Sequence, residues 1–153
     1  MALIVHKYGG TSMGSVERIQ QVAKRVAKWA RAGHQMVIVP SAMSGETNRL
    51  LGLAREIAPA HSTPSTLREM DMIAATGEQV SVGLLSLALQ AEGMPAISFA
   101  GWQVPVHTDS AYTKARIRQI DDERVRAALG AGKVVIITGF QGIDDQGNIT
   151  TLG

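Results

Sequence analysis

The chain contains no cysteine among its 153 residues, which excludes disulfide bonds and thiolate metal sites. The chain also has little net charge, because its 15 Lys and Arg residues are nearly balanced by 13 Asp and Glu residues, which leaves a formal net charge of +2. So small a surplus gives no support for a nucleic-acid-binding surface. We find no apolar run of about twenty residues and no signal peptide, and therefore expect a cytoplasmic protein that does not enter a membrane.

The residues that are present are those of a globular protein. Apolar residues make up 45% of the chain and charged residues 18%, and the length fits one domain. The four histidines lie too far apart in sequence to suggest a ligand pair, and we predict no metal site. Five basic residues fall on one predicted helix, as is typical of a solvated face: Arg18, Lys24, Arg25, Lys28 and Arg31.

Short apolar runs alternate with segments of helical periodicity along the chain. Strands are predicted at residues 3–5, 36–39, 95–100 and 134–137, and helices after Ser15, Gly45, Leu67, Gly77 and Asp121. The turn at residues 144–148 joins two apolar stretches and predicts a hairpin. This order predicts an α/β fold, a three-layer sandwich with a mostly parallel central sheet, in which the first strand is central.

Residues 7–12 join the first strand to a glycine-rich loop, Lys7-Tyr8-Gly9-Gly10-Thr11-Ser12. Gly9 and Gly10 lack the Cβ atoms that would keep backbone amides away from an anion, and the two residues after them add hydroxyl donors. Lys7 can neutralise charge on a transferring phosphoryl group. The alternatives are a tight bend without a ligand and a solvated lysine at a strand end.

Two further segments carry candidate binding groups. The loop from Ser41 to Gly45 precedes a helix and can bind an anion, or it can simply cap that helix. Glu78 opens a strongly apolar helix, where its carboxylate can bind an ammonium group or stabilise the first turn. Because Lys7, Ser41 and Gly139 each follow an apolar strand, we expect their loops to open at one edge of the sheet.

Four ordered blocks resemble the aspartate kinases of the amino-acid kinase superfamily. They are Lys7 to Ser12, Ser41 to Leu50, Thr76 to Ser81 and Gly139 to Ile143, and the closing residues 148–153 agree as well. The resemblance spans essentially the whole chain. It implies that residues 1–153 are the N-terminal part of an amino-acid kinase domain, without the nucleotide-binding half and the regulatory domains.

The resemblance also implies roles for individual residues. Lys7 is implied to be catalytic and, with Tyr8, Gly9 and Gly10, to bind ATP. The substrate-binding positions that it implies are Thr11, Ser12, Ser41, Thr47 and Glu78. Among these, Glu78 is implied to contact aspartate, and Thr47 either contacts the same substrate or only caps a helix.

The implied reaction is the MgATP-dependent phosphorylation of the side-chain carboxylate of L-aspartate to 4-phospho-L-aspartate, which feeds lysine, threonine and methionine synthesis. The acceptor is already a carboxylate, so positioning and charge neutralisation suffice without a strong general base. The resemblance implies a homo-oligomer for the intact protein. We expect no turnover from these 153 residues alone.

Two alternatives remain open. Another amino-acid kinase, acting on glutamate or acetylglutamate, would share the lysine-glycine-glycine opening but not the two middle blocks in these forms. The second alternative is a non-catalytic chain that binds aspartate, or that pairs with another subunit through the apolar helix at Leu84 to Leu89.

Overall fold

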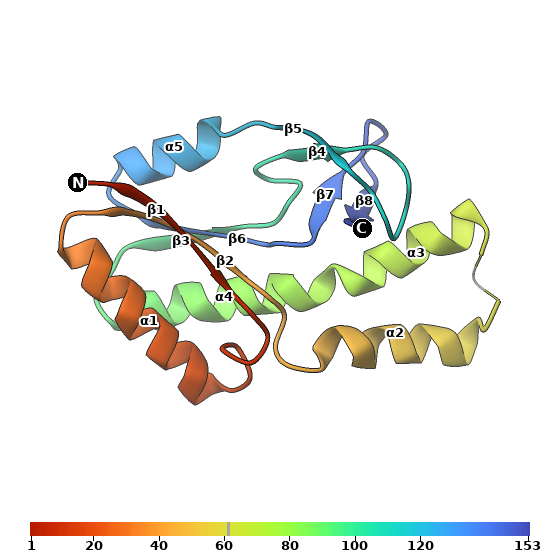
Figure 1. Ribbon diagram of the computed structural model, residues 1–153, viewed down its shortest axis with the longest axis horizontal. Coiled ribbons are helices and arrows are strands. Elements are labelled where there is room, and N and C mark those ends of the chain that lie inside the picture. Colours follow the sequence, from red (N-terminus) through yellow and green to blue (C-terminus); the bar gives the residue numbers. More distant parts are fainter. Residues whose placement is uncertain (61) are drawn as a thin grey trace.

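The computed structural model of the protein describes residues 1–60 and 62–153 (Figure 1). His61, one of the four histidines considered above, lies outside the described residues. The helices are α1 (Val16–Arg31), α2 (Glu46–Ile57), α3 (Pro64–Ala74), α4 (Thr76–Ala91) and α5 (Glu123–Gly130). The strands are β1 (Leu3–Tyr8), β2 (Gln35–Pro40), β3 (Ala96–Phe99), β4 (Val106–Thr108), β5 (Ile117–Ile120), β6 (Val134–Ile137), β7 (Gln141–Ile143) and β8 (Ile149–Thr151).

Four strands form a parallel sheet in the order β1-β2-β6-β3. Helices α1 and α4 cover one face and α5 lies on the other (Figure 1). Successive side chains of β2 point to opposite faces of the sheet, so this strand contributes to the core on both sides. Met36 and Ile38 pack with α1 and α4, while Val37 packs with α5. The predicted α/β fold with helices on both faces of a parallel sheet is confirmed.

The prediction that the first strand is central is wrong for the described residues, where β1 is an edge strand. It pairs with β2 on one side only. Leu3 and Val5 are 48% and 61% exposed, whereas the strands of a parallel sheet are normally covered on both faces. An apolar run by itself does not reveal which strand lies at the edge, because strand order depends on distant segments.

The other four strands form a mixed sheet in the order β5-β4-β7-β8. The predicted hairpin is present as β7 and β8, which pair antiparallel around Gly147, a glycine with φ of +81°. Strands β4 and β5 were not predicted. They have three and four residues, and β5 is exposed throughout, so neither carries an apolar alternation that could be recognised.

Helices α3 and α4 follow one another almost without a break. Together they span residues 64–91, and the stretch has the length and hydropathy of a membrane-spanning helix, with half of its most apolar window buried inside the protein. We expected no apolar stretch long enough to cross a membrane, and this expectation was wrong as far as length and hydropathy are concerned. Leu85 and Leu89, in the buried part of α4, pack against α1 and the sheet. A helix buried in the core of a protein is apolar for this reason, and so it can have the length and hydropathy of a membrane-spanning helix.

Candidate active site

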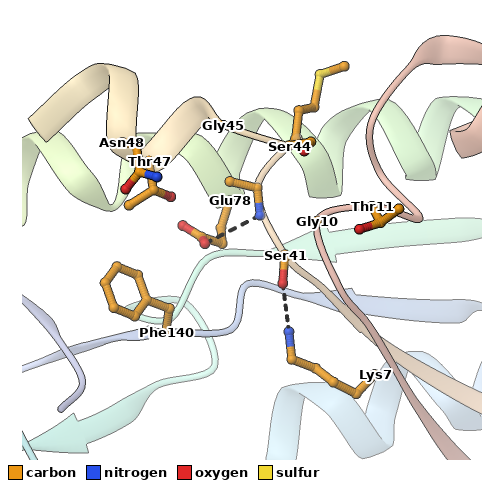
Figure 2. A pocket seen from close by; sticks show the side chains of 12 residues that line it. Lys7, Gly10, Thr11, Ser41, Ser44, Gly45, Thr47, Asn48, Glu78 and Phe140 are labelled. Atoms are coloured by element: carbon orange, nitrogen blue, oxygen red, sulfur yellow. Dashed lines mark hydrogen bonds between the residues drawn. The ribbon is translucent and has the colours of Figure 1, made fainter. Parts of the chain in front are cut away.

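A cavity of about 540 Å³ opens where the loops after β1, β2 and β6 meet the start of α4 (Figure 2). Its lining residues are Lys7, Gly10, Thr11, Ser41, Ala42, Met43, Ser44, Gly45, Thr47, Asn48, Glu78 and Phe140. The strands that lead into it are parallel, so their carboxyl ends share this edge of the sheet. Six residues predicted as binding or catalytic positions therefore lie around one cavity.

Lys7 and Ser41 are linked directly across two neighbouring strands. The Lys7 Nζ donates to the Ser41 Oγ at 3.0 Å, and the Ser41 amide donates to the Tyr8 carbonyl at 2.8 Å. Gly139 lies beside them, since a Cβ at this position would be 3.8 Å from the Lys7 Nζ. The prediction that these three loops open at the same edge is confirmed. The lysine ammonium group thus lies at the wall of the cavity, held by a neutral hydroxyl.

Glu78 is a buried carboxylate with one free oxygen. The side chain is 5% exposed, and its Oε1 accepts from the Ala42 amide at 3.3 Å (Figure 2). Its Oε2 is buried without a hydrogen-bond partner among the described residues. Burial raises the pKa of Glu78, against the opposing effects of the backbone amides of Glu78 and Ala42 and of the Lys7 charge. A ligand that supplies a positively charged donor would pair the free oxygen.

The approach of α4 to the loop after β2 depends on Gly77. A Cβ on this residue would lie 2.9 Å from the Ala42 Cβ, closer than two carbon atoms approach without displacement. Glycine therefore lets the first turn of α4 lie against the loop. This contact brings the Glu78 carboxylate within reach of the Ala42 amide.

Helix α2 also lines the cavity and begins without a side-chain cap among the described residues. Its N-cap is Gly45, in the left-handed region with φ of +78°, and no side chain accepts a capping hydrogen bond there. Thr47 is the second residue of the helix and lines the cavity. The cap that the sequence left open as an alternative for Thr47 is not formed, and neither Ser41 nor Ser44 caps the helix.

The glycine-rich loop uses several of its own amides internally. Ser12, Met13 and Gly14 donate to the carbonyls of Gly9, Gly10 and Thr11. Amides that could bind an anion are therefore restricted to the beginning of the loop. Gly10 and Thr11 line the cavity, while Gly9 does not.

Tyr8 and Ser12, also predicted as binding positions, line a neighbouring cavity with Arg18 and Arg25. This second cavity has a volume of about 340 Å³. The structure thus separates the glycine-rich segment into residues that face the Lys7–Glu78 cavity and residues that face α1.

Ser44, Asn48 and Phe140 line the main cavity and were not named as individual site residues. Ser44 and Asn48 belong to the second sequence block, so their position in it was the available signal. Phe140 has φ of +69°, a conformation uncommon for residues other than glycine, and Figure 2 shows its ring below Thr47 and Glu78. No sequence pattern indicates such a backbone conformation for a phenylalanine.

The family model of the amino acid kinases matches residues 2–153. The chain belongs to the amino acid kinase family. It is 60% identical over all 153 residues to an aspartate kinase of Pseudomonas fluorescens, of which it covers 37%. It thus spans little more than a third of the length of the curated relatives that it matches, and corresponds to their N-terminal part.

Solved structures of this family agree with the fold. The aspartate kinase from Synechocystis is 45% identical with a TM-score of 0.82, over 99% of this chain and 24% of that chain. E. coli aspartokinase III, solved in complex with aspartate and ADP, is 22% identical with a TM-score of 0.84, over 99% of this chain and 43% of that chain. At this lower identity the likeness shows the fold alone.

Within the described part of the chain, no three histidine, cysteine, aspartate or glutamate side chains gather where they could hold a metal ion. The cavity contains one carboxylate, and its hydroxyls and amides are neutral. A divalent cation prefers several oxygen ligands, usually with more than one carboxylate or phosphate among them. Magnesium accordingly enters the proposal below only as part of the substrate MgATP.

Proposed function

We propose that the chain forms the aspartate-binding and phosphate-binding part of an aspartate kinase, which transfers the γ-phosphoryl group of MgATP to the side-chain carboxylate of L-aspartate. The observation that carries the proposal is the cavity itself, which is lined by both a lysine ammonium group and a half-paired buried carboxylate. Similarity to aspartate kinases over the whole chain supports it. The E. coli relative solved with aspartate and ADP supports the choice of both substrates.

Glu78 would bind the ammonium group of aspartate. Its Oε2 needs a donor, and a cationic donor at that oxygen would also lower the pKa that burial raises. Thr47 and Asn48 of α2, which also line the cavity, offer a hydroxyl and an amide for the substrate's carboxylates. With the ammonium group fixed by Glu78, the side-chain carboxylate can extend toward Lys7.

Lys7 would stabilise the phosphoryl group as it is transferred. Its Nζ donates to a neutral hydroxyl and has no carboxylate within salt-bridge distance among the described residues, so its charge is available to an anion. The aspartate carboxylate attacks phosphorus, the bond from phosphorus to the bridging oxygen of ADP breaks, and ADP leaves with that electron pair. No side chain has to remove a proton, because the attacking carboxylate is already ionised.

Calorimetric titration of the chain with L-aspartate tests the amino-acid site. Wild-type protein should bind, Glu78→Ala should lose binding, and Thr47→Ala should weaken it. Glu78→Gln is the matched control for shape, because it retains the acceptor for the Ala42 amide but not the charge. If folded wild-type protein takes up no aspartate, this chain does not hold a working amino-acid site.

Glutamate and acetylglutamate in the same titration separate the proposal from other amino-acid kinases. Aspartate should bind at least about tenfold more tightly than either, since a longer side chain or a blocked amine does not fit a site anchored on Glu78. Preference for acetylglutamate would favour the alternative kinase.

The remaining proposals concern the whole protein. We propose a cytoplasmic homo-oligomer that binds L-aspartate and MgATP, with no nucleic acid or membrane partner. The first 153 residues alone should show no turnover, and a coupled ADP-release assay that gave an aspartate-dependent rate would contradict this. Light scattering would test pairing through the Leu84 to Leu89 segment of α4, where Leu87 is 63% exposed.

A further inference from the structure

Gln141 connects the second sheet to the helix that carries Glu78. It is the first residue of β7, and its side chain is almost inaccessible at 1% exposed. Its Nε2 donates to the Ala75 carbonyl at 2.8 Å. Ala75 is the single residue between α3 and α4 and is fully buried. The proposed reaction assigns no role to this hydrogen bond, although it lies three residues from Glu78.

The residue before Gln141 forms part of the cavity wall. Phe140 lines the cavity with φ of +69°, and its carbonyl accepts from the Leu152 amide at 2.8 Å. The Gln141 hydrogen bond therefore joins two walls of one cavity, the Phe140 turn and the first turn of α4.

The Gln141 backbone has little freedom to shift. A Cβ on Gly101 would lie 2.6 Å from the Gln141 carbonyl oxygen, and one on Gly142 would lie 2.6 Å from the Val106 carbonyl oxygen. The two glycines therefore let the backbone pack closely here, which fixes the strand between β4 and the loop after β3. Because the Gln141 backbone is fixed, the hydrogen bond from its side chain can hold the start of α4 at a set distance from β7.

We propose that Gln141 is a positioning residue for aspartate binding, which keeps Glu78 and Phe140 in register across the cavity. This inference rests on the proposed function. An amide suits the role because its N–H donates to a carbonyl, which an ionised carboxylate cannot do. The Gln141 Oε1 is buried without a partner among the described residues, so the link to Ala75 is the one hydrogen bond found there for this side chain.

Two substitutions separate positioning from packing. Gln141→Met keeps a similar length and removes the donor, so aspartate should bind about tenfold more weakly at every pH. Gln141→Glu should bind aspartate weakly when the new carboxyl group is ionised, but the neutral form regains an O–H donor to the Ala75 carbonyl. Its affinity relative to wild type should recover as the pH falls from about 8 to about 5.5, because the side chain at this position is almost completely buried and burial favours the neutral form of a carboxyl group.

Thr108→Val is the matched control. It removes the two hydrogen bonds of the Thr108 hydroxyl in the same sheet, one with the Thr150 hydroxyl at 2.6 Å and one donated to the Asp109 carbonyl at 2.8 Å. Neither bond involves a residue of α4. Its thermal midpoint should fall much as that of Gln141→Met does, and its affinity for aspartate should equal that of wild type. Equal weakening in the control would mean that general loosening of the sheet explains the effect, and would overturn the positioning role.

The titrations distinguish this inference from the proposed function. Wild-type binding together with undiminished binding by folded Gln141→Met overturns the positioning role alone. The same holds if Gln141→Glu fails to recover relative to wild type at low pH. If wild-type protein itself does not bind aspartate, the proposed function fails for this chain and the inference fails with it.

Discussion

Glu78 and Asp144 are both buried carboxylates, but they differ in how fully their oxygens are hydrogen-bonded. Glu78, at the cavity, accepts a hydrogen bond from the Ala42 amide, and its other oxygen has no partner in the described part of the chain. Burial raises the pKa of Glu78. Asp144, in the β7–β8 hairpin, is also buried, yet hydrogen bonds from Asn148, Ser110 and Tyr112 outweigh burial and lower its pKa to about 2.

Asp71 resembles Asp144 in having both carboxylate oxygens hydrogen-bonded. It is fully buried on α3 and accepts hydrogen bonds from the Thr113 amide and from both the amide and the hydroxyl of Thr151. These carboxylates fasten α3, β8 and the loop after β4 to one another. A carboxylate with all its acceptors used serves the fold, whereas one left half-paired at a cavity is available to a ligand.

Among the substitutions that test this comparison, Asp71→Ala should change stability most. It leaves the Thr113 and Thr151 donors buried without an acceptor, so the free energy of unfolding should fall by about 3–4 kcal/mol. Urea denaturation monitored by circular dichroism measures the change. Asp71→Asn, which retains one acceptor oxygen, is the control and should lose less; a loss below about 1 kcal/mol for alanine would contradict the structural role.

Asp144→Asn should cost about 2 kcal/mol at neutral pH, the free energy that corresponds to lowering the pKa from 3.8 to about 2. Between these values the unfolded chain holds the proton and the native protein does not, so stability rises with pH. The contribution is therefore present above about pH 4 and lost as the pH falls toward 2. Denaturation at several pH values should show wild type and variant converging in acid.

Glu78→Gln should change stability in the opposite direction, with a gain at pH 7. The native pKa is raised, so between the unfolded and native values the native protein holds the proton and stability falls as pH rises. Removing the charge removes this penalty while aspartate binding is lost. The two proteins should become equally stable below the unfolded pKa of glutamate, and a destabilised variant at pH 7 would contradict the assignment of Glu78 to ligand binding.

Thr47→Ala should have the smallest effect on stability, below about 0.5 kcal/mol, because the N-cap of α2 is Gly45 and no side chain caps the helix. Loss of a true threonine cap would cost about 1 kcal/mol. Thr63→Ala is the positive control, since Thr63 caps α3 in a capping box with Thr66. Thermal unfolding of both variants would settle the alternative that the sequence left open for Thr47.

Much of the candidate site could be predicted from motifs, and the missed parts share a physical cause. Lys7, Ser41 and Glu78 each lie in a segment whose local composition indicates its chemistry. Phe140 and Gln141 lie in the fourth sequence block, which predicts that their turn shapes the site, but it does not predict what each residue does there. Their individual roles depend on a backbone conformation and on a hydrogen bond to a residue 66 positions away. Long-range contacts of this kind leave no periodic pattern.

The sequence by itself determined the order of strands and helices in the parallel layer, the helix start at Ser15 and the hairpin at Gly147. These features depend on residues a few positions apart, so local propensity and periodicity are sufficient. Tertiary structure alone decided that β6 lies between β2 and β3. It also decided that, among the described residues, β1 lies at an edge and one oxygen of Glu78 is unpaired. Strand order and burial arise from packing between distant segments, which no local pattern encodes.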